Sequence, residues 1–252
     1  MRKPRAFPNL LAMLFFLLTG LVSVPAVSAI TIDGIFDEAL EWAGFYAADD
    51  GVGGSGYVGP GYGGQLFDVE YIGLKPVGDK IYFGLQTGFD LPNGSVYDGT
   101  TYHPGDLALD VDGDGFYEYA IDFNITSGVV TFDLYEVSTW QGVKYSAHAE
   151  SNPFQYASGT WLASFGGAYG AGVFTNNSDG GTSHVLEGGF EMSLLGLYAG
   201  GPITLHWTMD CGNDHLEVTS TPVPEPSTLI LVGSGGMGVL LLARRRGRGF
   251  RQ

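Results

Sequence analysis

The chain has 252 residues, of which 44% are hydrophobic and 15% are charged, and its formal net charge at pH 7 is −16. This hydrophobic content is sufficient for a folded core. The single cysteine excludes a disulfide-stapled scaffold and any zinc site made of several cysteines. The 41 glycines follow no collagen period and occur with 13% aromatic residues, which argues against collagen and against disorder.

Residues 1–29 are predicted to be a secretory signal peptide. Basic residues within positions 2–5 precede an apolar run over residues 10–24. Val27 and Ala29 then place small side chains at the −3 and −1 positions, so cleavage is expected after Ala29. The alternative, an uncleaved membrane anchor, is disfavoured because the apolar run is short for a spanning helix.

Residues 30–221 are predicted to form a single all-β domain. Short segments rich in β-branched and aromatic side chains alternate with breaks rich in Gly, Asn and Asp. Strands are predicted over 67–74, 80–87, 107–111, 116–123, 129–135, 160–165, 184–191, 203–211 and 215–219. So many short strands with so few helices predict an antiparallel, jelly-roll-like β-sandwich.

Two segments have helical character. Residues 36–42 are expected to form a short helical turn capped by Asp33, and residues 193–198 another, with Ser193 as its N-cap.

Two glycine-rich stretches are predicted to be loops. The stretch over residues 49–65 contains Tyr57 and Tyr62, and it is either a plain surface loop or a loop whose tyrosines stack on sugar rings. No lysine or helix follows it, which excludes a phosphate-binding loop. The stretch over residues 166–181 is expected to link two strands.

An acidic segment gives the sharpest local signal of a site. Asp110, Asp112 and Asp114 alternate with small or apolar residues, and Glu118 follows them. Such carboxylates can converge on Ca²⁺, which takes six to eight oxygen ligands. An EF-hand is excluded, because Ile121 occupies the position of its bidentate glutamate. The alternative is a polar β-hairpin, since Asp-Gly is also a strong hairpin-turn signal.

The strand predicted over residues 203–211 alternates polar and apolar side chains. Its apolar positions 207, 209 and 211 are expected to face the core, with Cys211 as a small buried hydrophobe. Its polar positions are expected to be exposed at the strand end. The alternative is a metal or acid–base cluster formed by His206, Asp210, Asp214 and His215.

The segment 222–252 contains three features in a fixed order. They are the tripeptide Pro224-Glu225-Pro226, an apolar stretch over residues 228–243, and an arginine cluster that begins with Arg244, Arg245 and Arg246. As a helix the stretch would be about 24 Å long, slightly less than the hydrocarbon core of a bilayer. The arginines are expected to stay in the cytoplasm, which leaves the body outside.

This tail resembles the PEP-CTERM sorting signal of Gram-negative, exopolysaccharide-producing bacteria. The resemblance implies that an exosortase processes the tail near the tripeptide after export. The protein would be held in the membrane by its C-terminal helix before processing and would then reach the cell surface or the extracellular matrix. The same tail is also labelled an ice-binding-protein C-terminal domain, but the body contains no regular Thr-x-Thr array that could present a flat lattice of hydroxyl groups.

The charge of the exported body differs from that of the whole chain. Three of the 11 basic residues lie in the signal peptide and five in the tail, which leaves Lys75, Lys80 and Lys144. Only Glu225 of the 27 acidic residues lies in the tail, so the body carries 26 acids and a charge of about −23. This balance excludes nucleic acid as a partner, since phosphate contacts need Lys and Arg. It favours divalent cations, a neutral extracellular polysaccharide, or solubility by mutual repulsion.

The start of the body, Ile32-Asp33-Gly34-Ile35-Phe36-Asp37-Glu38 with Trp42, resembles the opening of family 9 carbohydrate-binding modules and related DOMON-like sandwiches. The resemblance implies a first strand and turn that lead to a buried tryptophan. It also implies a sandwich of glycan-binding ancestry, without identifying a binding site.

These features predict an exported, exosortase-sorted, non-enzymatic protein of the cell surface or matrix. Its body would bind glycan or serve as a structural component, with calcium as a stabilising ion. The alternative is an extracellular hydrolase acting on matrix polysaccharide. That activity would require a convergent, partly buried carboxylate pair in a cleft lined by Trp140 or Trp161.

Overall fold

The computed structural model describes residues 30–49, 57–59, 61–196, 198 and 200–222. The predicted signal peptide with its cleavage site at Ala29, and the sorting residues from Pro224 to Arg246, lie outside the described residues. Within the described part of the chain, no helix has the length and apolar character needed to cross a membrane.

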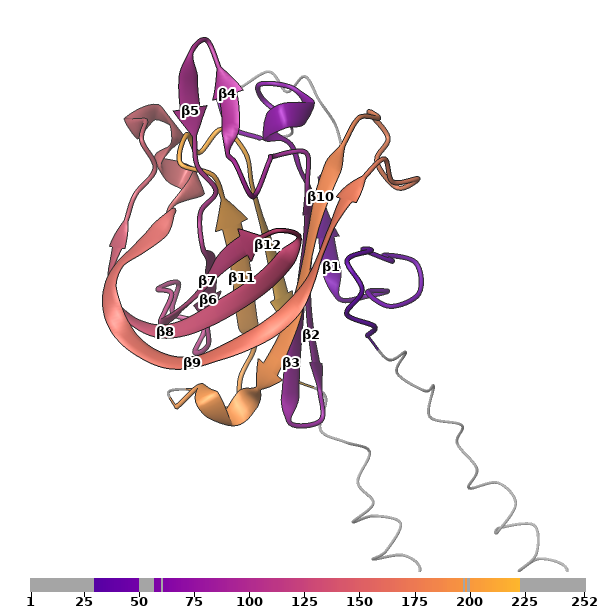
Figure 1. Cartoon of the computed structure of the whole chain (residues 1–252). Coiled ribbons are helices and arrows are strands. Elements are labelled where there is room, and N and C mark those ends of the chain that lie inside the picture. The colour runs from indigo at the N-terminus through magenta and orange to yellow at the C-terminus, as the bar shows by residue number, and fades with distance from the viewer. Residues whose placement is uncertain (1–29, 50–56, 60, 197, 199, 223–252) are drawn as a thin grey trace, which may run out of the picture. The chain divides into compact units, whose positions relative to one another are not determined.

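The described residues form one 10-stranded sheet and one two-stranded hairpin, in which all pairings are antiparallel (Figure 1). The order in the large sheet is β1-β2-β3-β10-β9-β8-β7-β6-β11-β12. Its strands are β1 (Tyr46–Ala48), β2 (Val69–Val77), β3 (Lys80–Thr87), β6 (Leu107–Asp110), β7 (Tyr119–Thr126), β8 (Val129–Gln141), β9 (Gln155–Gly172), β10 (Ser183–Glu191), β11 (Ile203–Thr208) and β12 (His215–Ser220). The hairpin consists of β4 (Ser95–Tyr97) and β5 (Thr100–Tyr102), and the 3₁₀ turns are η1 (Gln65–Phe67), η2 (Ser146–Ser151) and η3 (Met192–Leu194).

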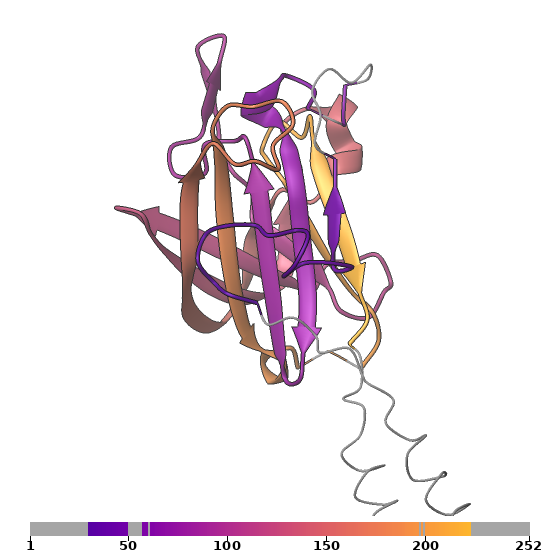
Figure 2. The same ribbon diagram turned by 90° about the vertical axis from the view of Figure 1, so that its right-hand side faces the viewer.

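The large sheet bends round until it nearly closes on itself. Its edge strands β1 and β12 lie side by side, and β12 also packs near β2 (Figure 2). The long strands β8 and β9 carry much of the bend, and their ladder shifts register after Leu134 and again between Val137 and Trp140. Such bulges increase the local twist and bending of a strand pair. The prediction of an all-β antiparallel body is therefore confirmed, whereas the expected pair of packed sheets is replaced by one curved sheet.

The main hydrophobic core fills the inside of this bend. Phe83 on β3 packs edge-on against Phe132 on β8, with ring centroids 5.0 Å apart, and Phe89 packs against Trp207 at 6.2 Å. Offset and edge-to-face aromatic pairs of this kind stabilise a core beyond the effect of area burial. The core therefore connects strands that lie far apart in the order of the sheet.

A second, smaller core lies on the opposite face of β2, β3 and β10. The N-terminal segment crosses this face (Figure 2) and buries Phe36 and Trp42 against it, next to Val185. The buried tryptophan expected from the opening motif is confirmed, but residues 32–38 contain no strand. Residues 36–42 form turns rather than a helix, and the cap is Asp37, whose Oδ1 accepts the N–H of Leu40 at 2.9 Å.

The glycine-rich stretch over residues 166–181 is only partly a loop. Residues up to Gly172 belong to β9, which pairs with both β8 and β10, so the predicted linker was too long. A short 3₁₀ turn lies where a helical turn was predicted over residues 193–198. The turn there, η3, begins at Met192 and has no side-chain cap, so the expected role of Ser193 is wrong.

Candidate functional site

The predicted calcium ligands lie together in the connection between β6 and β7. Asp110 ends β6, Glu118 precedes the first residue of β7, and Asp112 and Asp114 lie between them. One carboxylate oxygen from each of the four residues lies within 4.8 Å of the others. A local sequence pattern thus folds into a local cluster of oxygen donors, which suits a hard divalent cation such as Ca²⁺.

Backbone hydrogen bonds hold the carboxylates of this loop in place. The Asp110 carboxylate accepts the N–H groups of Asp112 at 3.1 Å, Gly113 at 2.7 Å and Gly115 at 3.0 Å. Gly113 and Gly115 have φ values of 78° and 86°, a left-handed conformation that favours glycine. The tight turn therefore depends on both the aspartate and the glycines.

The electrostatics of the loop favour the binding of a cation. Burial raises the pKa of the Glu118 carboxyl group, and the charges of Asp112 and Asp110 raise it further. A cation bound among these groups would relieve their mutual repulsion and stabilise their ionised forms.

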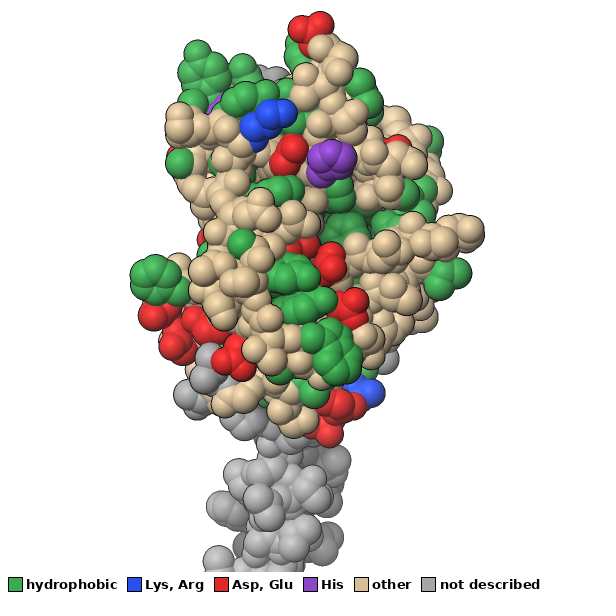
Figure 3. Space-filling view, turned by 60° about the vertical axis from the view of Figure 1, so that its left-hand side comes forward, with side chains coloured by type: hydrophobic (Ala, Val, Ile, Leu, Met, Phe, Trp, Pro, Cys, Tyr) green, Lys and Arg blue, Asp and Glu red, His purple; other side chains and the backbone are tan. Residues whose placement is uncertain are grey.

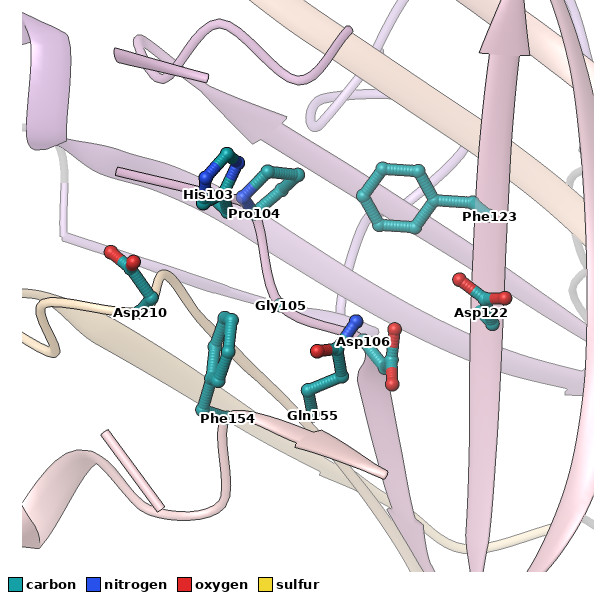
Figure 4. A pocket seen from close by; sticks show the side chains of 9 residues that line it. All are labelled: His103, Pro104, Gly105, Asp106, Asp122, Phe123, Phe154, Gln155 and Asp210. Carbon is teal, nitrogen blue, oxygen red and sulfur yellow. The ribbon is translucent and has the colours of Figure 1, made fainter. Parts of the chain in front are cut away.

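A second acidic feature lines a cavity of about 340 Å³ on another part of the body (Figure 4). Asp106 is 2% exposed, and its Oδ2 accepts the N–H of Tyr156 at 2.8 Å. Its carboxyl group also hydrogen-bonds to that of Asp122 from β7. Burial, with the neighbouring Asp122 as a lesser cause, raises the pKa of Asp106 to about 8, which favours the protonated form of Asp106 at neutral pH.

This carboxyl pair only partly matches the arrangement expected for a hydrolase. The cavity is lined by Phe123 and Phe154 rather than by Trp140 or Trp161. The two carboxyl groups are hydrogen-bonded to each other. The two catalytic carboxyl groups of a glycosidase are instead separated by roughly 5–9.5 Å. The hydrogen bond between the two carboxyl groups therefore favours a paired acid over two separated catalytic groups.

The polar face of β11 is buried, contrary to the prediction. His206 and Thr208 are 0% exposed, because residues that include Ser151 and Pro153 cover this face. His206 Nε2 lies 3.2 Å from the Ser151 carbonyl oxygen and 3.1 Å from that of Pro153, and its Nδ1 lies 3.4 Å from Glu217 Oε1.

The four-residue cluster proposed from the sequence divides into separate interactions. His215 lies near His206, with ring centroids 5.7 Å apart. Asp214 instead accepts the N–H of Val69 at 2.8 Å. Asp210 lines the same cavity as Asp106 and Asp122. Cys211 is buried as predicted, and burial raises the pKa of its thiol to about 12, far from that of a reactive cysteine.

An aromatic pocket of about 370 Å³ was not predicted as a unit. It forms where the β4–β5 hairpin, η2, the turn before η1 and the residues after β11 come together. Its lining residues are Tyr62, Gly63, Phe67, Tyr97, Tyr102, Tyr145, His148, Cys211 and Asn213.

The two tyrosines of the first glycine-rich stretch lie at this pocket. The ring centroid of Tyr57 is 6.0 Å from that of Tyr62 and 6.2 Å from that of His148. The tyrosines named in the sugar-stacking alternative for that stretch therefore lie beside other aromatic rings of the pocket. Sequence reasoning missed the tyrosines at positions 97, 102 and 145, because the first two lie on the β4–β5 hairpin and the third lies more than 40 residues later, just before η2.

Hydrogen bonds within the pocket wall determine which of its polar groups can contact a ligand. The hydroxyl groups of Tyr102 and Tyr145 lie 2.9 Å apart, and this contact is the main reason that the pKa of Tyr102 rises to about 12. His148 Nδ1 lies 2.6 Å from the carbonyl oxygen of Cys211. A carbonyl oxygen only accepts, so Nδ1 carries a proton, and Nε2 is the ring nitrogen left for other contacts.

Comparison with known proteins identifies the tail of the chain. Residues 222–246 match the model of the PEP-CTERM protein-sorting motif, and this range includes Pro224, Glu225, Pro226 and the arginines at positions 244–246. The motif implies an exported protein that is anchored in the membrane by its C-terminus and sorted by an exosortase. No curated protein and no solved structure matches the chain. The resemblance of residues 32–42 to family 9 carbohydrate-binding modules and DOMON-like proteins is not supported by any match.

Proposed function

We propose that this chain is a non-enzymatic protein of the cell surface or extracellular matrix whose body binds a neutral glycan and is stabilised by calcium. The observation that carries glycan binding is the gathering of tyrosines from separate segments around one pocket. Aromatic rings supply a large contact area at low conformational cost, and tyrosine adds a polar group at its edge.

The charge of the body supports a neutral ligand. Acidic side chains far outnumber basic ones on the face shown in Figure 3, in keeping with a body charge of about −23. An anionic polysaccharide would be repelled by this field, whereas a neutral one would not.

The sorting motif supports the proposed location. Residues 228–243 would hold the exported body at the membrane until an exosortase acts near Pro224-Glu225-Pro226. The body would then remain at the surface among the secreted polysaccharides.

Affinity electrophoresis of the exported protein tests glycan binding. We expect retardation in gels that contain at least one of dextran, soluble starch and galactomannan, and none in gels that contain anionic alginate. Migration that is unchanged in all of the neutral gels would contradict the proposed ligand class.

Thermal unfolding with and without a chelator tests the role of calcium. We expect the chelator to lower the melting temperature of the unchanged protein, and Asp112→Ala to abolish this difference. Asp179→Ala, which removes an exposed aspartate from another turn, should keep it. Identical melting curves with and without the chelator would overturn the calcium proposal.

The second candidate function is an extracellular hydrolase acting on matrix polysaccharide, and the Asp106–Asp122 pair in its cavity is the observation that favours it. A hydrolase would release new reducing ends from dextran, starch or galactomannan, and Asp106→Asn would abolish this release. We expect no release from the unchanged protein, because the two carboxyl groups are hydrogen-bonded to each other.

A further inference from the structure

We infer that the aromatic pocket between the β4–β5 hairpin and η2 binds the terminal sugar unit of a neutral glycan chain. This inference rests on the proposed glycan binding and adds to it the position of the site and the part of the chain that it recognises.

The first argument is the accessibility of the aromatic walls. Tyr97 on β4 is 62% exposed and Tyr145, just before η2, is 39% exposed, although both line the pocket. A pyranose ring has an apolar C–H face that can pack on such a ring, while its hydroxyl groups remain at the edge. Exposed tyrosines on separate segments can therefore contact one sugar unit from more than one side.

The second argument is the presence of polar groups beside these rings. The hydroxyl groups of Tyr102 and Tyr145 form a hydrogen-bonded pair, and the Nδ1–H of His148 is engaged by the Cys211 carbonyl oxygen, which leaves Nε2 as the ring nitrogen that can contact a ligand. A sugar hydroxyl group, which both donates and accepts, can hydrogen-bond to this nitrogen or to a tyrosine oxygen. An apolar pocket with a few converging polar groups is the usual form of a small-molecule site.

The third argument is charge. Lys144 lies beside the tyrosine pair, with its Nζ 5.0 Å from the ring centroid of Tyr102 and 5.9 Å from that of Tyr145. Its charge also interacts with the carboxylate of Asp210. The lysine is thus engaged in cation–π contacts and is partly balanced by an acid, which favours an uncharged sugar over a uronic acid.

The fourth argument is size. At about 370 Å³ the pocket is near the lower end of the roughly 300–1,000 Å³ range of ligand sites. That volume suits one or two sugar units rather than the interior of an extended chain. The interior of a glycan chain would instead need a long, flat aromatic surface. The exposed ring of Trp161 is the main alternative to the pocket as a sugar-binding surface.

Trp161 lies on β9, away from the pocket, and is 56% exposed. Its Nε1 donates to Asp133 Oδ1 and to Ser164 Oγ, both at 3.3 Å, so its edge is already engaged while its face remains free. Trp161→Ala is therefore the matched control, because it removes an exposed aromatic ring of the same body.

The experiment combines affinity electrophoresis with competition by small glycosides. We expect Tyr97→Ala to weaken retardation by the neutral polysaccharides about tenfold or more, which corresponds to about 1.4 kcal/mol. Tyr145→Phe, which removes only a hydroxyl group, should give a smaller loss, and Trp161→Ala should have no effect. Because Tyr97 is well exposed on a hairpin, its truncation should leave the melting temperature nearly unchanged.

Competition tests the recognition of chain ends. Methyl α-glucopyranoside or methyl α-galactopyranoside, which mimic terminal units of these polysaccharides, should release the protein from the corresponding gel. Full retardation of Tyr97→Ala, loss of retardation in Trp161→Ala, or failure of both glycosides to compete would overturn this inference while leaving glycan binding intact. Unchanged migration of the unaltered protein in every neutral gel would overturn the proposed function together with the inference.

Discussion

The carboxylate of Glu187 on β10 is fully buried and binds the N-terminal segment to the sheet. It accepts the N–H of Asp33 at 3.1 Å, the N–H of Gly34 at 2.9 Å and the indole N–H of Trp42 at 3.3 Å. Burial raises its pKa to about 7, although these donors lower it. A single side chain thus satisfies three donors of a segment that has no strand of its own.

Glu187→Gln should destabilise the protein. The amide group would direct N–H donors at groups that are themselves donors, and a buried donor left unsatisfied costs about 1–3 kcal/mol. Chemical denaturation should show this loss, and hydrogen exchange should accelerate at residues 33–42. Glu191→Gln, in the half-exposed pair with Lys80 at the end of the same strand, should change stability by less than about 1 kcal/mol. Equal stability of the two variants would contradict this role of Glu187.

Residues close in sequence were the predictable part of the site. Asp110, Asp112, Asp114 and Glu118 could be grouped because one short connection contains all of them. The aromatic pocket could not be found in this way, since Tyr97 and Tyr145 line one pocket only after the hairpin and η2 have packed. His206 was placed on an exposed face because alternation alone does not reveal which segment covers it.

Among the elements, β2 and β3 are shaped to accept a tryptophan side chain. Gly73 and Gly84 are directly paired across these strands. A Cβ atom added at Gly73 would lie 2.4 Å from Trp42 Cε3, and one at Gly84 would lie 2.7 Å from Trp42 Cζ2. The paired glycines form a slot in which the indole ring lies flat against the backbone, which explains why Trp42 is 0% exposed.

Gly73→Ala should therefore lower the free energy of unfolding, although alanine is ordinarily better tolerated than glycine within a strand. The added methyl group has no free space and must displace a fixed aromatic ring, an overpacking change that typically costs about 1–3 kcal/mol. Gly166→Ala in β9 is the matched control, since a Cβ there meets nothing within 4 Å. Denaturation midpoints should fall for the first variant only, and a fall of equal size in both would contradict the slot.

Close tertiary contacts at glycines also explain why some strands were predicted less accurately than others. β3 was predicted with its observed bounds, Lys80–Thr87, because its alternating pattern is bounded by clear breaks. β9 was predicted too short because its second half is rich in glycine, which is ordinarily depleted in strands. In the fold, a Cβ at Gly167 would lie 2.2 Å from the Glu187 carbonyl oxygen, so glycine is needed there for close approach. Such a requirement arises from tertiary contacts and is not visible in a local pattern.

For the whole body, the excess of acids combines with burial to make stability depend on pH. Burial raises the pKa of Asp106 to about 8 and those of Glu187 and Asp214 to about 7. Each group is ionised in the unfolded chain well below these values, so the folded state binds more protons through the neutral range. Their stabilising contribution is full at low pH and is lost as the pH rises through the folded-state pKa values.

Two histidines act in the opposite direction but in a lower window. Burial lowers the pKa values of His184 and His215, so their contribution is present above the ordinary histidine pKa of about 6.5 and is lost as the pH falls below it. Above pH 6.5 the carboxyl groups therefore dominate. The free energy of unfolding, measured with chelator present to remove any effect of bound calcium, should decrease from pH 6.5 to pH 8.

Asp106→Asn separates this effect from general charge repulsion. The amide is neutral at every pH and can still donate to Asp122, so the decrease in stability between pH 6.5 and pH 8 should become shallower. Asp179→Asn removes one exposed charge of the same sign. It should change the free energy of unfolding slightly at every pH and leave its dependence on pH unchanged. If both variants kept the original slope, the Asp106–Asp122 pair would not be a source of the pH dependence. Buried Glu187 and Asp214, together with the repulsion among surface acids, would then remain as its causes.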